Sequence, residues 1–385
     1  MPSIAMIMGI IVMLLVLVGS NCYITFRLYQ GVKYIFPQLS AIIFIILGII
    51  MVLPFILGFT RSMLPVSETV KRIFGVITSY WMGIFLYLFL YFLLADIILL
   101  LLRIIKAIQY PMPQGTYFFT GILMVLITAI TVSYGIYNAN RIKQVTYNIR
   151  LGKKAQGSEF NLILLSDLHL GAVGSEKRLE KLVQSINIIE PDIVCIAGDI
   201  FDNDYHAIHN PEEAIRLLKT IKSKYGVYAC LGNHDAGRTF DKMLDFLERC
   251  NIKTLNDEYA IIDDRLVLIG RLDSSPIGGF GDMKRKNIEE IMSGIDTKLP
   301  VIVMDHNPIH IGEYGNEVDL ILSGHTHRGQ IFPGDLFTRA LFVVDYGYYR
   351  KDDNSPHIVV TSGTGTWGMP MRIGSDCEIV NIYIR

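Results

Sequence analysis

The chain has 385 residues, of which 51% are hydrophobic and 18% are charged, and its formal net charge is −1. The charges divide unevenly: residues 1–140 carry nine charged side chains and a net charge of +5, whereas residues 141–385 carry 62 and a net charge of −6. This division excludes a single soluble domain, a disordered chain and a nucleic-acid binder driven by overall basicity, and no sequence-specific nucleic acid is expected as a partner. The polar part is long enough to bury a core of its own.

The first 140 residues contain four long apolar runs. Each reaches about 20 residues, the length that a helix needs to cross the hydrocarbon core of a bilayer. No Lys or Arg precedes the first run and no small-residue cleavage pattern follows it, which disfavours a cleaved signal peptide. The sequence therefore predicts four transmembrane helices within residues 1–140, near Ile4–Phe26, Leu39–Thr60, Phe74–Leu102 and Phe118–Tyr137.

Asp96 lies within the third run. An ionisable residue inside a membrane marks a functional site by default. Alternatively, the crossing ends near Leu94, Asp96 lies among the lipid head groups, and an interfacial helix with Arg103 and Lys106 follows. The second interpretation is favoured, and the role of the helices beyond anchoring stays open.

Basic residues near the ends of the spans predict the orientation. Eight Lys and Arg residues fall on the side shared by the second loop and the polar part, against four on the opposite side. Because cytoplasmic loops are enriched in Lys and Arg, we expect a multi-pass protein of the cell membrane whose polar part is cytoplasmic. The odd number of cysteines, five, agrees with a reducing compartment.

Residues 141–158 are expected to form a basic linker and residues 159–385 a separate domain. Short apolar runs there alternate with helical patterns, one of which begins at Asn210 and Pro211, a favourable start for a helix. The pattern predicts a mixed α/β layered domain. Its expected helices lie near 175–188, 211–224 and 240–249, and its strands near 162–165, 193–197, 227–231, 260–262, 266–270, 301–304, 320–322, 358–361 and 379–384.

Five of these apolar runs stop at clusters of Asp, His, Asn and Gly. In α/β sheets, ligands gather beyond the carboxyl ends of the strands, so the five clusters are expected to converge. Imidazole and carboxylate donors without cysteine suit Zn, Mn or Fe ions. Seven donors are too many for one ion but suit two ions about 3.5–4 Å apart. The clusters are Ser166–His169, Gly198–Asp202, Gly232–Asp235, Asp305–Pro308 and Gly324–His327.

The ordered set Asp-x-His, Gly-Asp-x-x-Asp, Gly-Asn-His-Asp, a lone His and Gly-His-x-His resembles the calcineurin-like metallophosphoesterase family, in particular its membrane-associated bacterial phosphodiesterase-like branch. The resemblance covers about Phe160–Arg385. It implies a layered β-sandwich flanked by helices and two divalent ions, Mn2+, Zn2+ or Fe2+. By resemblance, one ion is held by Asp167, His169 and His327, the other by Asn233, His306 and His325, and Asp199 bridges them.

The resemblance also implies roles for neighbouring residues. His234 is expected to assist the leaving alkoxide after attack by a metal-bridging hydroxide, and Asp202 and Asp235 to orient histidines. Arg328 is either a phosphate contact or a surface residue. Arg372, at the end of a glycine-rich stretch that resembles the C-terminal loop of the branch, is either a phosphate contact or a solvent-facing side chain.

The predicted function is therefore a membrane-anchored dinuclear-metal phosphoesterase. Phosphodiesters are favoured over phosphomonoesters on the resemblance alone, and the substrate is either lipid-linked or a nucleotide. The bilayer is the other expected partner. The alternative is a membrane transport or sensing protein whose phosphoesterase-like domain is regulatory or non-catalytic.

Overall fold

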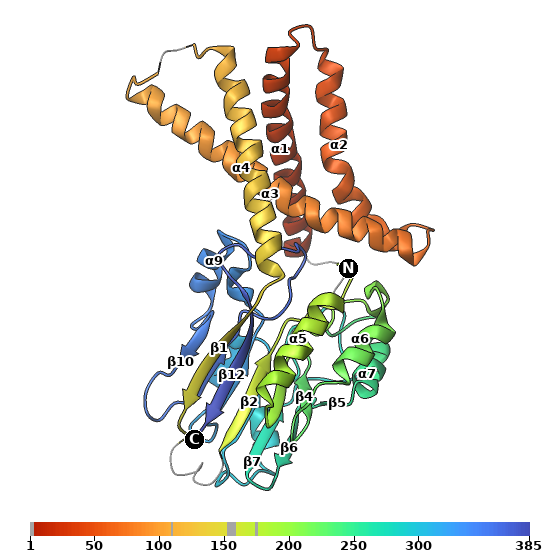
Figure 1. The fold of residues 1–385 in the computed structure, drawn as a ribbon, viewed down its shortest axis with the longest axis vertical. Helices are drawn as coiled ribbons and strands as arrows, with labels where there is room; N and C mark the ends of the chain where they lie inside the picture. The colour runs from red at the N-terminus through yellow and green to blue at the C-terminus, as the bar shows by residue number, and fades with distance from the viewer. Residues whose placement is uncertain (1–3, 109–110, 152–158, 174–175) are drawn as a thin grey trace. The chain divides into compact units, whose positions relative to one another are not determined.

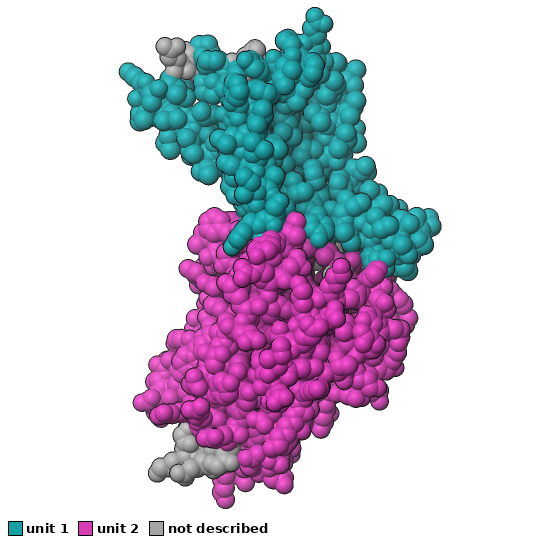
Figure 2. All heavy atoms as spheres, in the orientation of Figure 1, with its two compact units in different colours: residues 1–134 teal, residues 135–385 magenta. Residues whose placement is uncertain are grey.

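The computed structural model describes residues 4–108, 111–151, 159–173 and 176–385 (Figure 1). The chain divides into two compact units, Met1–Tyr134 and Gly135–Arg385, coloured separately in Figure 2. We call them unit 1 and unit 2 and describe each by itself.

Unit 1 is helical. Four helices, one of which ends inside unit 2, are long and apolar enough to cross a membrane, as the apolar runs predicted. Three of them extend beyond the predicted runs because they also take up polar residues at their ends, such as Glu68, which follows the Ser67 cap, whereas the second helix lies within its run. They are α1 (Ile4–Ile35), α2 (Ala41–Thr60), α3 (Glu68–Ile104) and α4 (Gln114–Ala139).

Asp96 of α3 has a partner in unit 1. Its Oδ1 atom lies 3.1 Å from Nη2 of Arg27, and its Oδ2 atom accepts a hydrogen bond from the hydroxyl of Tyr23 at 2.5 Å. Arg27 is buried, and its guanidinium lies over the rings of Phe92 and Tyr117. This pairing between α1 and α3 could not be anticipated from the apolar run around Asp96, because the two charges lie far apart in the sequence.

Unit 2 contains two six-stranded sheets. The strand order is β1-β12-β2-β3-β4-β5 in one and β10-β11-β9-β8-β7-β6 in the other. The pairs β2–β3 and β3–β4 in the first sheet and β8–β9 in the second are parallel, so their carboxyl ends meet at common edges. The strands are β1 (Ile142–Ile149), β2 (Phe160–Leu165), β3 (Ile193–Ala197), β4 (Val227–Cys230), β5 (Ile252–Thr254), β6 (Glu258–Ile262), β7 (Leu266–Gly270), β8 (Val301–Met304), β9 (Leu320–Ser323), β10 (Gly347–Tyr349), β11 (His357–Val360) and β12 (Cys377–Ile384).

The buried apolar side chains of unit 2 form three layers of core. One lies between the two sheets and includes Leu164, Met304 and Val359. Another packs the first sheet against the helices α5 (Glu176–Ile189), α6 (Pro211–Leu218) and α7 (Phe240–Arg249), which Figure 1 shows on one face of that sheet. The third covers the far face of the second sheet together with α8 (Ile288–Met292). The predicted layered sandwich flanked by helices is confirmed.

Several elements differ from the sequence-based expectation. The expected linker 141–158 contains β1, which pairs in parallel with β12 from Ile142 opposite Cys377 to Ile149 opposite Ile384. Polar residues alternate along β1 because most of this edge strand is not buried, and the pattern therefore reads as a linker. Helix α6 ends at Leu218 rather than Lys224, and β5, β10, α8 and α9 (Gly334–Leu341) were not expected. The expected helix start at residue 175 and the end of the expected linker, 152–158, lie outside the described residues.

Candidate metal centre

The five clusters converge at the carboxyl ends of five strands. Asp167 and His169 follow β2, Asp199 follows β3, and Asn233 follows β4 in the first sheet. In the second sheet, His306 follows β8, and His325 and His327 follow β9. Both sheets therefore contribute donors to one place, as the sequence pattern predicted.

The backbone of these loops is bent sharply. Asp167, His169, Asp199, His325 and His327 all have positive φ angles, between 46° and 70°, in a region that non-glycine residues rarely adopt. Such conformations persist where the surrounding structure enforces them, and they cluster at functional sites. Gly198 has a φ of 78°, and a Cβ atom there would lie 2.7 Å from Nδ1 of His306, so glycine is needed for this close approach.

The first group of donors consists of Asp167, His169 and His327. Nε2 of His327 lies 3.1 Å from Nε2 of His169 and 3.2 Å from Oδ1 of Asp167. All three side chains are buried. Their donor atoms lie within 4.8 Å of one another, as one ion requires.

The second group consists of Asp199, His306 and His325, with Asn233 beside it. Nε2 of His306 lies 3.1 Å from Oδ2 of Asp199 and 3.3 Å from Nδ1 of His325, which in turn lies 3.0 Å from Oδ1 of Asn233. The same Oδ2 atom of Asp199 lies 3.8 Å from Nε2 of His169 in the first group. Asp199 thus faces both groups, the position expected of a bridging carboxylate.

The donor set fits divalent ions. Ligand bonds of about 2.1 Å place neighbouring donors of one ion about 3.0–3.4 Å apart, and most of the distances above fall in that range. Oδ1 of Asp167 is buried without a hydrogen-bond partner among the described residues. A buried carboxylate oxygen in this state is costly unless a cation satisfies it.

The protonation states of most of these residues also suit ion binding. Burial raises the pKa of the carboxyls of Asp167 and Asp199, but the charges of His327 and His306 outweigh it, and both pKa values lie below the usual range. Burial lowers the pKa of His169 and His327, and it lowers the pKa of His325 to about 4. Carboxylates and neutral imidazoles are the metal-binding forms.

His306 is the exception among the histidines. Burial lowers its pKa, but the charge of Asp199 outweighs burial and raises the pKa well above the usual value. Its Nδ1 atom lies 2.8 Å from the carbonyl oxygen of Ala197, which leaves Nε2 to face Asp199. His306 would therefore release a proton on binding an ion through Nε2.

The two aspartates expected to orient histidines lie in different surroundings. Oδ1 of Asp202 lies 3.9 Å from Nδ1 of His169, and Asp202, His169 and His234 form a third group of possible donors. Asp235 instead accepts hydrogen bonds from the backbone N–H groups of Phe201 and Gly232. It braces the loops after β3 and β4 rather than a histidine ring.

Neither arginine proposed as a phosphate contact lines the pocket. The guanidinium of Arg328 lies over the ring of Tyr346 at 4.4 Å. Arg372 is completely buried: Nη1 donates to the carbonyl oxygen of His327 at 2.9 Å, and Nη2 lies 3.1 Å from Nδ1 of the same residue. The buried position of Arg372 corrects the expectation of a phosphate contact or a solvent-facing side chain, because its guanidinium holds His327, a predicted metal ligand.

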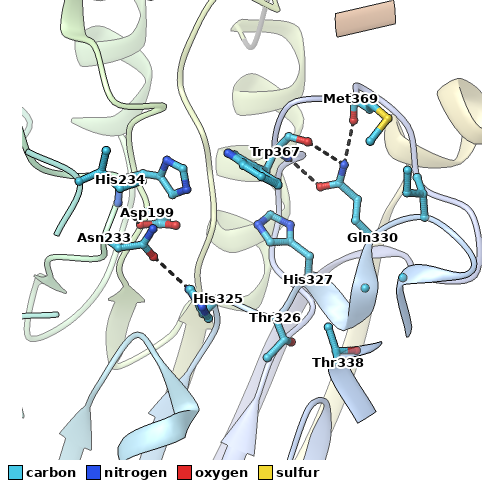
Figure 3. A pocket seen from close by; sticks show the side chains of 14 residues that line it. Asp199, Asn233, His234, His325, Thr326, His327, Gln330, Thr338, Trp367 and Met369 are labelled. Carbon is cyan, nitrogen blue, oxygen red and sulfur yellow. Dashed lines mark hydrogen bonds between the residues drawn. The ribbon is translucent and has the colours of Figure 1, made fainter. Parts of the chain in front are cut away.

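A cavity of about 450 Å3 opens beside the donors (Figure 3). His234 faces it, and Nδ1 of His234 lies 2.9 Å from Oδ1 of Asn203. The ring of Trp367 lies 5.7 Å from that of His234. The side-chain amide of Gln330 holds this part of the chain through hydrogen bonds with the backbone of Trp367 and Met369.

The roles of Asn203, Gln330 and Trp367 were missed from the sequence. Two sequence positions could have indicated these residues. Asn203 directly follows the Gly198–Asp202 cluster, and Gln330 closely follows the last histidine pair. Trp367 lies in the glycine-rich stretch that was noted, but its contact with His234 depends on the tertiary fold.

Comparisons with known proteins agree with this geometry. A family model described as calcineurin-like phosphoesterase matches residues 160–329. A zebrafish (Danio rerio) protein named "Transmembrane protein with metallophosphoesterase domain" is 30% identical over 283 residues, which cover 69% of this chain and 62% of that protein. An Aquifex aeolicus protein named "Uncharacterized metallophosphoesterase" is 32% identical over 240 residues, which cover 62% of this chain and 90% of that protein.

Among solved structures, a putative 5'-nucleotidase from Staphylococcus aureus is similar at 14% identity with a TM-score of 0.37, covering 58% of this chain and 54% of that one. This similarity is too distant to support a functional conclusion. The sequence relatives show the family. The Aquifex aeolicus protein is 32% identical to this chain and is covered over 90% of its length, and the family model matches residues 160–329. The chain belongs to the calcineurin-like metallophosphoesterase family.

Proposed function

We propose that this protein is a membrane-anchored phosphoesterase that uses two divalent ions and favours phosphodiesters. The observation that carries the proposal is the pair of donor groups around Asp199, whose oxygen faces histidines of both groups. Asp167, His169 and His327 would hold one ion, and Asn233, His306 and His325 the other, with Asp199 shared. When bound, the two ions supply positive charge for the phosphoryl group and lower the pKa of a water molecule.

The residues of the chain would orient and protonate the substrate. His234 lies at the cavity, and with Oδ1 of Asn203 as the acceptor, its Nδ1 atom carries a hydrogen. Nε2 is then the atom that faces the substrate. The hydrogen bond with Asn203 fixes the orientation of the ring, so that Nε2 would donate a proton to the departing alkoxide.

The charge of the cavity supports a preference for phosphodiesters. Among the described residues that line it, Asp199 is the only Asp, Glu, Lys or Arg. A phosphomonoester dianion favours additional basic side chains such as arginine, whereas a phosphodiester carries a single negative charge. Because no arginine is among the described residues that line the cavity, the phosphodiester is favoured.

The four apolar helices support the membrane anchor, and the excess of basic residues near the second loop and the start of unit 2 supports a cytoplasmic location for unit 2. An alkaline phosphatase fused to the C-terminus tests the orientation, since it is active only outside the cytoplasm. We expect an inactive fusion, and an active one would overturn the cytoplasmic assignment.

Activity is tested with the full chain purified in detergent. We expect hydrolysis of bis(p-nitrophenyl) phosphate that requires Mn2+ and stops on chelation. Asp199→Asn should abolish both turnover and the binding of two ions, whereas Asp264→Asn, the same change at an exposed position, should alter neither. The proposal fails if the Mn2+-loaded protein leaves the diester intact, or if Asp199→Asn retains full activity; the transport or sensing alternative then gains support.

A further inference from the structure

Helix α9 presents apolar side chains to solvent beside the cavity. No residue within this helix is buried. Five large apolar side chains in and around it are more than half exposed: Phe332, Leu336, Phe337, Leu341 and Val343. Contiguous exposed apolar side chains on a water-soluble face are unfavourable and mark an interaction surface. We call these five residues the α9 patch.

The helix that carries the α9 patch also borders the cavity. Gly334 and Thr338 of α9 form part of the cavity wall, together with Ile331, which directly precedes Phe332. On another part of the wall lies Trp367, which is 52% exposed, and Met369 lines the cavity beside it (Figure 3). Apolar side chains therefore lie both on α9 and on the cavity wall beside His234.

The chain enters unit 2 at the same loop. The backbone N–H of Arg372 donates to the carbonyl oxygen of Gly135 at 2.9 Å, and Nδ2 of Asn138 donates to the carbonyl oxygen of Ser375, also at 2.9 Å. Gly135 and Asn138 form the last turn of α4, a helix that is apolar and long enough to cross a membrane. Under the proposed membrane anchor, α4 would therefore leave the bilayer directly before its contacts with the loop that carries Trp367.

We propose that the α9 patch and Trp367 lie in the bilayer interface and that the cavity admits the phosphate of a membrane lipid, with the lipid alcohol against Trp367. This inference rests on the proposed phosphoesterase activity. A bilayer is the occupant favoured by the tether, and amphipathic helices with exposed aromatic and aliphatic residues bind its interface. The apolar residues of the cavity lining include Ile277, Ile331 and Met369 in addition to Trp367, and they suit an uncharged alcohol.

The reaction would release the lipid alcohol. Water adds its oxygen to phosphorus, the bond between phosphorus and the lipid alcohol oxygen breaks, and that oxygen takes a proton from His234. Of the two protons of the attacking water, one replaces, through solvent, the proton that His234 donated, and the other is carried by the phosphomonoester product. Phosphatidylglycerol would yield diacylglycerol and glycerol phosphate.

The contact with lipid is tested by fluorescence. The chain has two tryptophans, so Trp81→Phe leaves Trp367 as the single emitter. In phosphatidylcholine nanodiscs, brominated acyl chains should quench Trp367. A double variant, Phe337→Glu with Leu341→Glu, should reduce the quenching, whereas Ile188→Glu, at an exposed apolar residue of α5, should not. Unchanged Trp367 emission in brominated nanodiscs overturns the interfacial placement, as does a detergent-solubilised dimer that shields the patch.

The substrate is tested in the same nanodiscs with phosphatidylglycerol or phosphatidic acid, by measuring released diacylglycerol. The double variant should lose about tenfold in this activity, because two apolar contacts with the bilayer are removed, but should keep hydrolysis of bis(p-nitrophenyl) phosphate. Hydrolysis of the soluble diester without release of diacylglycerol from either lipid overturns this inference alone. Failure to hydrolyse the soluble diester overturns the proposed function instead.

Discussion

Unit 1 and unit 2 both bury ionisable groups, but they satisfy them differently. In unit 1, Arg27 and Asp96 neutralise each other, and two aromatic rings cover the guanidinium. In unit 2, two carboxylates and four histidines from four loops turn their oxygen and nitrogen atoms toward one another, and Oδ1 of Asp167 has no hydrogen-bond partner in the described structure. The Arg27–Asp96 ion pair links two helices and needs no further partner. The donor atoms of unit 2 converge on one place, an arrangement that suits a cation.

The largest expected effect concerns His234, which belongs to the centre of unit 2 but to neither ion group as we assign them. His234→Ala should lower kcat by about a thousandfold, since it removes the proton donor, and should leave both ions bound. Turnover of bis(p-nitrophenyl) phosphate and metal content by mass spectrometry are the two measurements. His209→Ala, at an exposed histidine, is the control. Loss of an ion in His234→Ala would instead make His234 a ligand.

The next effect breaks the pair in unit 1. Asp96→Leu leaves the buried Arg27 without its counter-charge and should lower the free energy of unfolding by about 3 kcal/mol. Arg27→Leu combined with Asp96→Leu should recover most of this loss. Thermal unfolding of the helices in detergent micelles, followed by circular dichroism, measures both. A double variant as unstable as Asp96→Leu alone would show that the unpaired charge is not the cause.

A variant at Arg372 tests whether this residue positions His327 or binds the substrate. Lysine cannot reproduce the paired contacts of the guanidinium with the carbonyl oxygen and Nδ1 of His327. Arg372→Lys should therefore weaken metal affinity about tenfold, as loss of a residue that orients a ligand does, while KM at saturating Mn2+ stays unchanged. An increase in KM with unchanged metal affinity would restore the original expectation of a phosphate contact.

The smallest effect is expected at the surface. Glu213 and Arg216 form an exposed ion pair one turn apart on α6. Exposed pairs contribute little to stability, so Glu213→Gln should leave both the melting temperature and the activity within measurement error. A clear loss of stability in Glu213→Gln would show that an exposed ion pair contributes as much as the pair formed by the buried Arg27.

The sequence predicted the parts of the molecule that local patterns encode. Strands such as Ile193–Ala197 follow from a short run of buried apolar residues, the four apolar helices follow from long apolar runs, and the predicted metal donors follow from polar residues placed directly after strands. The remainder depends on partners far away in the chain. The burial of Arg372 against His327 and the role of Asp235 as a backbone brace are set by tertiary packing, so residue type alone suggested the wrong partner.

The position of β12 has a consequence for biosynthesis. The last strand of the chain lies between β1 and β2, and its residues Cys377–Ile384 pair with β1 along its whole length. Because the ribosome delivers β12 after β1 and β2, this sheet stays interrupted until residues 377–384 have emerged, long after the first helices. A chain truncated before Cys377 would contain every described helix but would lack β12, and β1 would then have no neighbouring strand in the sheet.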